Sequence, residues 1–514
     1  MSSDPSLHHR DPLIQPLDEH NQTLLNHVHP ADWQNPTPAG RYNLVVIGGG
    51  TAGLVTAVGA AALGAKVALV ERRLLGGDCL NVGCVPSKAL LRCARAAADV
   101  RDAGQFGVLL GEPARVDFSA VMERMRRLRA EISPHDSAER FRNLGVDVYL
   151  GDARFAGPDR VVVASQTLHF ARACIATGSR AAVPKIDGLE GIAFHTNETI
   201  FSLTELPRRL AVVGGGPIGC ELAQAFARFG SEVVLVQRGD RLLPHDDHDA
   251  SMIVQQAMTR DGVRVVLDAQ LDAVSQTTDG KQLRIALAEG SHEQLTVDEL
   301  LIGVGRVPNV TGLGLEAAGV AYDSQQGVQV NDFLQATNRR IYAAGDVCTR
   351  YRFTHMADAL ARIVIRNALF FGRAKASKLV VPHCTYTDPE LAQVGLTAAD
   401  AARQQIAIDT LTVPFESVDR AIVDGERRGL LKIHLKRGSD QIVGATLVAR
   451  HAGEMLSELT LAIEAGVGLK TLSRTIHPYP TQAEAIKKAA DQYQRTRLSP
   501  RVKRLLTVWL SWRR

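Results

Sequence analysis

The sequence has few cysteines, little net charge and no long apolar run. Its 514 residues include seven Cys, an odd and low number that argues against a secreted disulfide framework and favours a reducing, cytoplasmic setting. The formal net charge is +4, and with no nucleic-acid-binding motif present, nucleic acid is not an expected partner. No apolar run reaches the roughly 20 residues of a transmembrane helix.

The hydrophobic fraction of 45% indicates a packed globular protein, and the length indicates three or more structural units. Residues 1–40 are rich in His, Pro, Asn and Asp, contain no signal-peptide pattern, and end in Asn-Pro-Thr-Pro-Ala-Gly. We therefore expect an N-terminal extension that is mobile or draped over the surface, with solvated histidines.

A glycine-rich fingerprint follows the first predicted strand, at residues 42–47. Its glycines are Gly48, Gly50 and Gly53, and an Ala-rich helix comes directly after them. A second strand at residues 66–70 ends at Glu71, which can accept both hydroxyls of an adenosine ribose. The pattern predicts a dinucleotide whose pyrophosphate lies at the helix N-terminus.

The same unit recurs in the middle of the chain, with strands predicted at residues 210–213 and 232–236 and a helix between them. Its glycines are Gly214, Gly216 and Gly219. The ribose-reading position is Gln237, followed by Arg238. Because no carboxylate is present to repel a 2′-phosphate, this loop accepts NADPH or NADH and favours NADPH, unless Arg238 is simply solvated.

Two cysteines with four residues between them lie between these fingerprints, in the segment Gly-Gly-Asp-Cys-Leu-Asn-Val-Gly-Cys-Val-Pro-Ser-Lys at residues 76–88. This spacing lets Cys79 and Cys84 form a disulfide or separate as a dithiol. A structural zinc site would need four ligands, and no matching Cys or His cluster occurs. The prediction is a redox pair, with no structural metal site but with thiolates suited to a substrate metal ion.

The other five cysteines are scattered, and each is predicted to be a small buried residue. They are Cys93, Cys174, Cys220, Cys348 and Cys384. Cys348, two residues after Asp346, is the one whose reactivity deserves a test.

Together, the cysteine motif, the paired fingerprints, the Gly345-Asp346 block and the segment Asp388-Pro389-Glu390-Leu391-Ala392 resemble the flavoprotein disulfide reductases of the pyridine nucleotide-disulfide oxidoreductase family. The resemblance implies a homodimeric α/β enzyme with two Rossmann-like domains and an α+β dimerisation domain. The implied FAD domain covers residues 41–190 and 325–380, the NAD(P) domain 191–324 and the dimerisation domain 381–494.

The resemblance also implies roles for individual residues. Cys84 would lie against the flavin and form the charge-transfer complex, while Cys79 would be the outer thiol. Lys88 would lie near the flavin and pair with Glu221, although both could instead be ordinary helix residues. Asp346 matches the family residue that binds the ribityl chain of FAD. Glycine or polar positions at strand ends, where α/β sheets bind ligands, add Thr177 and Gly178 for FAD and Gly305 for NAD(P).

One departure occurs near the C-terminus. Family members that process dithiols carry a His–Glu pair from the partner subunit, and here the spacing to Glu484 puts Tyr479 at the His position. His477 matches an earlier, non-catalytic position. Because a phenol with a pKa near 10 is a poor base at neutral pH, the pattern favours mercuric reductase-like members, which also carry Tyr there.

Two features of mercuric reductases are absent from this sequence, an N-terminal metal-binding domain and C-terminal vicinal cysteines. The expected reaction is therefore transfer of two electrons from NAD(P)H, through FAD and the dithiol, to a thiol-bound metal ion such as Hg(II). The alternative acceptors are a small disulfide, as in dihydrolipoamide dehydrogenase, a quinone or Cu(II), with His477 as the base.

The basic tail at residues 495–514 combines Arg and Lys with Trp, Leu and Val at helical spacing. It is expected to be an amphipathic helix. The interpretations left open are a solvated helix, an extension that stabilises the dimer, and weak contact with an anionic membrane surface, which would suit a redox sensor.

Overall fold

The computed structural model describes residues 14–112 and 114–514, and it confirms the predicted mixed α/β class. The chain forms two compact units. Unit 1 comprises the residues up to Gly214 together with Ala225–Val236 and Gln270–Leu379, and unit 2 comprises Gly215–Gln224, Gln237–Ala269 and Val380–Arg514.

The main sheet of unit 1 has the strand order β3-β2-β1-β6-β5-β4, with β18 paired to β6. The parallel strands are β1 (Arg41–Ile47), β2 (Val67–Glu71), β3 (Val146–Leu150), β6 (Gln166–Ile175) and β18 (Ile341–Ala343). An antiparallel hairpin adds β4 (Ala153–Gly157) and β5 (Arg160–Val163). The apolar run of β1 is buried from Leu44 to Ile47, as expected for a parallel strand covered on both faces.

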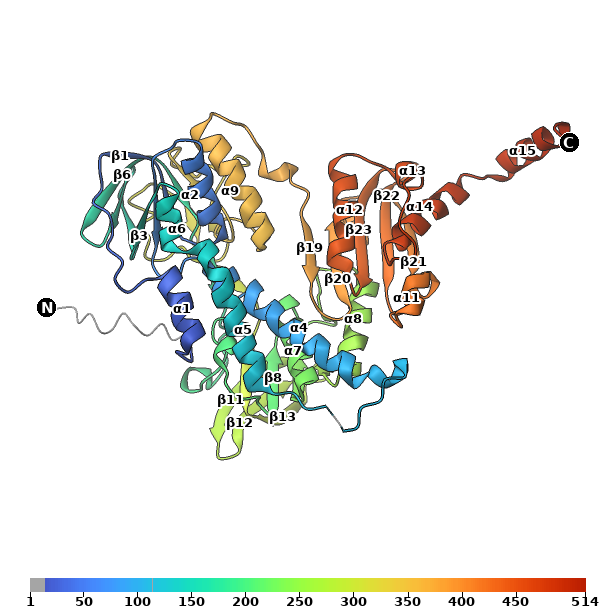
Figure 1. Ribbon diagram of the computed structural model, residues 1–514, viewed down its shortest axis with the longest axis horizontal. Helices are drawn as coiled ribbons and strands as arrows, with labels where there is room; N and C mark the ends of the chain where they lie inside the picture. Colours follow the sequence, from blue (N-terminus) through green and yellow to red (C-terminus); the bar gives the residue numbers. More distant parts are fainter. Residues whose placement is uncertain (1–13, 113) are drawn as a thin grey trace. The chain divides into compact units, whose positions relative to one another are not determined.

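Helices α2 (Thr51–Ala62) and α9 (Thr354–Leu369) lie side by side against this sheet (Figure 1). The remaining helices of this part are α3 (Gly77–Asn81), α4 (Cys84–Arg101), α5 (Phe118–Ile132) and α6 (Ala138–Asn143). The predicted order of strand, glycine loop, helix and second strand is therefore observed, with β2 one residue later at each end than expected.

The second nucleotide-type pattern is also observed. Strands β8 (Arg209–Val213), β9 (Glu232–Val236) and β14 (Glu299–Ile302) pair in parallel in the order β9-β8-β14, and α7 (Pro217–Phe229) connects the first two. Unit 1 also contains smaller antiparallel sheets. These are β11 (Gln270–Thr277) with β12 (Gly280–Ala286) and β13 (His292–Val297), β7 (Ser179–Ala181) with β15 (Arg306–Pro308), and β16 (Tyr322–Asp323) with β17 (Gly327–Val328).

Unit 2 is built on a five-stranded antiparallel sheet of order β19-β20-β23-β22-β21. Its strands are β19 (Pro382–Thr385), β20 (Glu390–Gly395), β21 (Ile408–Pro414), β22 (Leu430–Lys436) and β23 (Ile442–Ala449). Its helices are α8 (His248–Arg260), α10 (Ala398–Arg403), α11 (Asp419–Val423), α12 (Ala452–Glu464), α13 (Leu469–Leu472), α14 (Glu484–Thr496) and α15 (Pro500–Trp512), and the short strand β10 spans Arg264–Val266. Apolar side chains of α12 and α14 pack on the sheet in one core.

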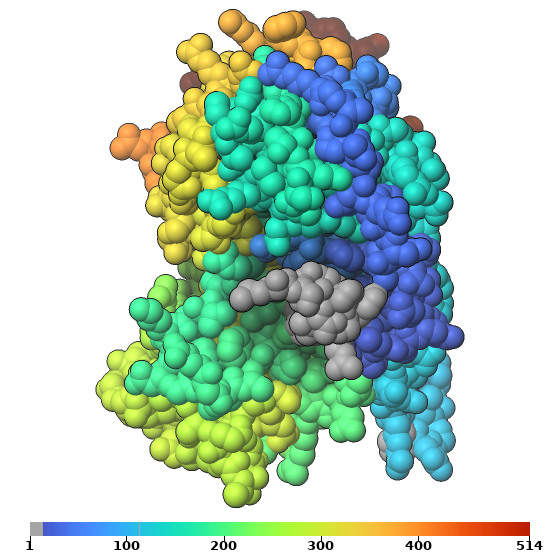
Figure 2. Space-filling view, turned by 90° about the vertical axis from the view of Figure 1, so that its left-hand side faces the viewer, coloured from blue at the N-terminus to red at the C-terminus, as the bar shows by residue number. Residues whose placement is uncertain are grey.

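The expectation of a mobile or surface-draped N-terminal segment is wrong for its described part. Residues 19–28 form helix α1 (Glu19–Val28), which Asp18 caps by accepting a hydrogen bond from the Asn21 amide. Leu24 and Val28 are fully buried, and α1 packs against α5 and α6. Figure 2 shows this dark-blue first part of the described chain lying against teal residues further along. Residues 1–13 lie outside the described residues.

The predicted helix in the basic tail is present as α15, and none of its residues is buried. Across the described ranges, no helix is both long enough and apolar enough to cross a membrane.

Candidate active site

The two cysteines of the motif lie on consecutive helices. Cys79 is in the short helix α3, and Cys84 is the first residue of α4. Gly83 separates them, and a Cβ there would lie only 2.7 Å from the Asp78 carbonyl oxygen. Both cysteines are free thiols, and the Cys84 Sγ lies 3.3 Å from the Thr354 Oγ1 at the start of α9. The structure therefore brings the predicted pair together in its dithiol form.

The two thiols are hydrogen-bonded to each other. This hydrogen bond raises the pKa of Cys79 well above its usual value, and burial and the nearby charges of Cys84 and Asp136 raise it further. Because the thiols interact in this way, they titrate as a coupled pair.

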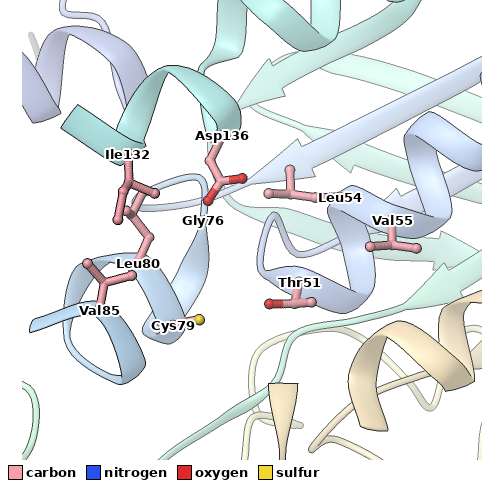
Figure 3. Close-up of a pocket in the computed structure, with 9 residues that line it drawn as sticks. All are labelled: Thr51, Leu54, Val55, Gly76, Cys79, Leu80, Val85, Ile132 and Asp136. Carbon is pink, nitrogen blue, oxygen red and sulfur yellow. The ribbon is translucent and has the colours of Figure 1, made fainter. Parts of the chain in front are cut away.

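Cys79 also lines a cavity of about 180 Å³. The lining residues are Thr51, Leu54, Val55, Gly76, Cys79, Leu80, Val85, Ile132 and Asp136. Figure 3 shows the Cys79 sulfur and the Asp136 carboxylate pointing into this space, across from Thr51 and Leu54 on α2. Burial raises the pKa of Asp136. No sequence pattern marks Asp136, which lies 57 positions from Cys79 along the chain.

A buried arginine holds the helix that carries Cys79. Arg129 of α5 is 1% exposed, and burial lowers its pKa to about 10. Its guanidinium donates to the Asn81 carbonyl at 2.6 Å and to the Asn21 side-chain oxygen of α1 at 2.6 Å. Asn81 in turn donates to the Leu75 and Gly77 carbonyls. Through the Arg129 side chain, helix α1 of the N-terminal segment is thereby connected by hydrogen bonds to α3, the helix that carries Cys79.

The first glycine loop allows very close backbone contacts. Gly48 has a φ of 108°, and a Cβ there would lie 2.3 Å from the Ala176 carbonyl oxygen. At Gly53, a Cβ would lie 1.8 Å from the Gly48 carbonyl oxygen. Gly50 precedes α2 as its N-cap without a side-chain hydrogen bond, so the first amides of the twelve-residue helix face outward as an anion site.

Glu71 ends β2 beside this loop. Its Oε2 accepts a hydrogen bond from the Gly49 amide at 2.5 Å, and its Oε1 accepts one from the Arg73 amide at 2.6 Å. Burial raises the pKa of Glu71 despite these two bonds. The carboxylate is thus fixed at the edge of the glycine loop, where the sequence predicted a ribose-binding acid.

The other predicted FAD residues share one hydrogen-bonded cluster. The Thr177 hydroxyl donates to the Asn309 carbonyl at 2.7 Å, and Gly178 has a φ of 67°. Asp346 accepts a hydrogen bond from the Ser179 hydroxyl at 2.6 Å. Burial raises the pKa of Asp346.

Arg306 was not predicted as a site residue, yet it joins this cluster to the cysteine motif. Its guanidinium donates to the Ser179 hydroxyl at 2.7 Å, approaches Asp346 at 3.7 Å and forms an ion pair with Asp78, the neighbour of Cys79. Gly305, predicted for NAD(P), has a φ of 131° and accepts a hydrogen bond from the Ala182 amide. The glycine-arginine segment therefore belongs to a sheet edge shared with β7.

The second glycine loop repeats the first with a neutral partner. Gly214 has a φ of 112°, and a Cβ there would lie 2.4 Å from the Gly303 carbonyl oxygen. The Gly215 amide donates to the Gln237 side-chain oxygen at 2.9 Å. Arg238 is exposed. The Gly216 carbonyl accepts a hydrogen bond from the Cys220 amide, and Gly219 lies within α7.

The predicted lysine–glutamate pair is divided between the two units. Lys88 of α4 is half-buried in unit 1, and its Nζ donates to the Ser87 hydroxyl at 3.3 Å. Glu221 of α7 is buried in unit 2 and accepts a hydrogen bond from the Tyr386 amide at 2.9 Å. Their pairing stays a prediction.

Near the C-terminus, the three predicted residues have separate partners. The Tyr479 hydroxyl donates to Asp419 at 3.0 Å, and this hydrogen bond raises the pKa of Tyr479. The His477 Nε2 lies within hydrogen-bond distance of the Glu458 carboxylate, at 2.9 Å. Glu484 pairs with Lys488 through Oε1, while its buried Oε2 has no hydrogen-bond partner among the described residues.

Three of the remaining cysteines, Cys174, Cys220 and Cys348, are not activated thiols, because burial raises the pKa of each. Cys174 and Cys220 are buried as predicted, and burial raises the pKa of Cys174 to about 12. Cys93, Cys348 and Cys384 are half-buried. Burial also raises the pKa of Cys348, whose thiol donates to the Gly345 carbonyl. Cys348 therefore has no thiolate character that would make it reactive at neutral pH.

Comparison with known proteins identifies two domains. The sequence profile of the pyridine nucleotide-disulphide oxidoreductases matches residues 42–361, and that of the dimerisation domain of these proteins matches residues 381–490. A mercuric reductase from Lysinibacillus sphaericus is 35% identical, with 87% of this chain and 82% of that protein covered. A dihydrolipoyl dehydrogenase from Thermus scotoductus is 34% identical, with 88% and 97% covered.

Solved structures show the same likeness. The HOCl-induced flavoprotein disulfide reductase RclA from Escherichia coli superposes with a TM-score of 0.77 at 28% identity, covering 88% of this chain and 99% of that one. Its Cu(II) complex gives a TM-score of 0.78 over 88% and 100% of the two chains, also at 28% identity.

Proposed function

The chain belongs to the pyridine nucleotide-disulphide oxidoreductase family, and we propose that its Cys79/Cys84 dithiol delivers two electrons to a thiol-bound metal ion such as Hg(II). Members of this family are flavoprotein enzymes that use FAD and NAD(P)H. Because the chain is about equally identical to a mercuric reductase and to a dihydrolipoyl dehydrogenase, sequence identity does not indicate the electron acceptor. The proposal for the acceptor therefore rests on the residues of the site.

The residues of unit 1 fit FAD. The glycine loop before α2 packs so closely that a Cβ at Gly48 would overlap the Ala176 carbonyl, which leaves its backbone amides suited to a phosphate, and Glu71 offers a fixed carboxylate for a ribose. Asp346 is a half-buried acceptor on the cluster that reaches Asp78 through Arg306. When bound, FAD supplies hydride acceptance from the nicotinamide and the two electrons that reduce a cysteine disulfide.

The dithiol supplies the chemistry toward the metal. Cys79 and Cys84 lose their protons as the soft cation binds both sulfurs, because thiolates are the ligands that such cations prefer. Two electrons then pass to the ion as the sulfur–sulfur bond forms, so that a divalent ion leaves as the neutral metal and the disulfide remains. No proton needs to reach the substrate in this reaction.

The observation that carries the proposal is the environment of Tyr479. A disulfide substrate leaves as a thiolate that needs a proton, and a general acid or base works best with a pKa near the operating pH. The Tyr479 phenol is held by Asp419, which moves its pKa further from neutrality. Electron transfer to a metal ion requires no proton donor at this position.

An acceptor panel tests this proposal. Purified holoenzyme with NADPH or NADH is offered Hg(II) with excess thiol, Cu(II), a quinone, lipoamide and glutathione disulfide, and nicotinamide oxidation is followed. We expect the highest kcat/KM with Hg(II) and little turnover of either disulfide. A clear preference for lipoamide would overturn the proposal.

A matched pair of variants separates the proton requirement from binding. Tyr479→His restores an imidazole and is expected to raise disulfide turnover by about 10²-fold or more, with little change for Hg(II). Tyr479→Phe removes the hydroxyl without adding a base and should leave disulfide turnover low. Equal disulfide rates in both variants would show that residue 479 is not the proton carrier.

The assignment of the inner thiol has its own spectroscopic test. We propose Cys84 as the thiol against the flavin and Cys79 as the outer thiol. Cys84→Ser should abolish the long-wavelength absorption band of the two-electron-reduced protein, whereas Cys79→Ser should retain it. A band that survives in Cys84→Ser and disappears in Cys79→Ser would reverse the two roles.

A second candidate, reduction of a small disulfide, is favoured by one observation. His477 lies within 2.9 Å of Glu458, and an imidazole beside a carboxylate is a common acid–base arrangement. His477→Gln distinguishes the candidates, because it should leave Hg(II) turnover unchanged and would abolish disulfide turnover only if His477 is the base.

The matched dimerisation domain supports a homodimer. Unit 2 leaves apolar side chains exposed on that domain, with Val423 72%, Leu461 67% and Ile476 94% exposed. Such residues are suited to an interface between two copies.

A further inference from the structure

The helix that ends the described chain has an apolar face with nothing packed over it. Helix α15 (Pro500–Trp512) is exposed along its whole length and is labelled in Figure 1. Leu505 is 70%, Trp509 55% and Trp512 80% exposed. Exposed large apolar side chains in such number usually mark an interaction site.

The spacing of these residues makes the helix amphipathic. Val502, Leu505, Leu506 and Trp509 follow the i, i+3, i+4, i+7 pattern of a single helix face. Lys503, Arg504, Thr507 and Ser511 occupy the opposite face. The helix is thus divided lengthwise into an apolar half and a polar, cationic half.

The charge of the segment indicates what covers that face. Residues 497–514 contain five Arg and one Lys and no acidic residue, and the last acidic residue before them is Asp491. The Arg513 guanidinium lies over the Trp509 ring, 5.9 Å from its centroid. Tryptophan and cationic side chains at the rim of an apolar face are typical of helices that lie in the plane of a membrane surface.

A second copy of the chain is the less suitable occupant. Two α15 helices brought face to face would add like charges, with no acidic residue in the segment to balance them. The dimerisation domain has its own exposed apolar residues for that purpose, and its matched region ends at residue 490, before α15 begins.

We propose that α15 binds anionic membrane surfaces, with its apolar face inserted among the lipids and its Arg and Lys side chains at the headgroups. A single helix of this kind binds weakly. A homodimer carries two, so that the second contact is made at high effective concentration. This surface contact is independent of the electron acceptor and requires no segment that spans the membrane.

Co-sedimentation of the full-length holoenzyme with vesicles tests the proposal. We expect binding to vesicles of phosphatidylcholine with phosphatidylserine, little binding to phosphatidylcholine alone, and loss of binding at high salt. Lys503→Gln with Arg504→Gln should weaken binding to the anionic vesicles about thirtyfold. Each cation near an anionic surface contributes about 1 kcal/mol, and a loss of about 2 kcal/mol corresponds to that factor.

Two matched double variants separate the faces. Leu505→Gln with Trp509→Gln changes the apolar face and should reduce vesicle binding at least tenfold, because both side chains lose their buried area. Thr507→Gln with Ser511→Gln makes the same kind of change on the polar face and should retain binding. All variants should keep their bound flavin and NAD(P)H oxidation, since these residues are exposed and outside the site.

Light scattering on the same samples gives the competing outcome. We expect the same dimeric mass for the wild type and both double variants. Equal sedimentation of the Leu505→Gln/Trp509→Gln variant and the wild type, or no preference for anionic vesicles, would overturn the proposal. A smaller mass for that variant would instead show that α15 contacts a second copy.

Discussion

The two glycine loops have nearly the same backbone and end in different side chains. Gly48 and Gly214 have φ values of 108° and 112°, and a Cβ on either would meet a carbonyl oxygen at 2.3 or 2.4 Å. In each loop, the next glycine donates its amide to a side chain 22 residues on, Glu71 in the first and Gln237 in the second. One loop thus presents a buried carboxylate and the other a neutral amide beside an exposed arginine.

From this difference we infer that the loop backbone suits a dinucleotide in general and that the side chain at the strand end distinguishes a ribose from a ribose 2′-phosphate. A carboxylate accepts from two ribose hydroxyls and repels a 2′-phosphate. Glu71 therefore suits the adenosine of FAD, whereas Gln237 with Arg238 permits NADPH. Both conclusions concern one position in each loop, so single substitutions test them.

The largest expected effect is loss of the shared backbone. Gly48→Ala and Gly214→Ala should each cost about 3 kcal/mol or more of unfolding free energy, because a Cβ would overlap a carbonyl and the positive φ is strained. Gly216→Ala is the control, since a Cβ there meets nothing within 4 Å. Urea unfolding measures the loss of unfolding free energy. A large loss at only one of the two glycines would show that the two loops do not depend on the same backbone geometry.

Glu71→Gln should weaken FAD binding by about 2 to 3 kcal/mol. The amide can offer only one oxygen, whereas the carboxylate accepts from the Gly49 and Arg73 amides with separate oxygens and its bonds are charge-assisted. Flavin release during dialysis, followed by fluorescence, measures the change. Unchanged affinity would mean that Glu71 serves the loop backbone alone.

The reciprocal change belongs to the second loop. Gln237→Glu introduces a carboxylate beside the site of the 2′-phosphate and should lower kcat/KM for NADPH by about thirtyfold, an electrostatic cost of about 2 kcal/mol. The value for NADH should change much less. Equal losses with both nicotinamides would indicate damage to the loop rather than repulsion.

The two loops should also differ in their response to pH. Ribose binding needs the Glu71 carboxylate, and burial raises the pKa of that group above its ordinary value of 4.5. FAD affinity should therefore fall as pH falls through this raised pKa, by about tenfold per unit below it. Titrations with apoprotein should show this step in the wild type and not in Glu71→Gln. Nicotinamide affinity should show no step from the neutral Gln237.

The smallest effect is expected at Arg238. Because this side chain is exposed, Arg238→Ala should lower kcat/KM for NADPH by about three- to fivefold, the worth of an exposed ion pair. The loss should shrink at high salt, and NADH should be unaffected. A similar loss for NADH would show that Arg238 does not contact the 2′-phosphate.

Local sequence patterns predicted the parts of the fold that depend on neighbouring residues. The strand, glycine loop, helix and second strand were found at both sites, and Cys79 and Cys84 were paired, because their spacing alone limits what they can do. Asp136 beside Cys79 and Arg306 beside Asp78 escaped prediction. Each comes from a distant part of the chain, and an isolated aspartate or arginine has no pattern that marks it.

The N-terminal segment was misjudged for a related physical reason. Its apolar residues are few, and their pattern in α1 is short, so composition alone suggested a solvated lead-in. Burial of Leu24 and Val28 depends on α5 and α6, which lie about a hundred residues further on. The helix propensity of the segment carries no information about this packing against distant helices.

The hydrogen bonds of Arg129 bear on where this protein can be cut. The family match begins at residue 42, and that boundary invites a shortened protein starting there. Such a protein would lose Asn21, which accepts a hydrogen bond from one nitrogen of the buried Arg129 guanidinium. The other nitrogen donates to the carbonyl of Asn81, two positions from Cys79. Helix α1, which precedes the region of the family match, is therefore hydrogen-bonded through Arg129 to the segment that carries Cys79.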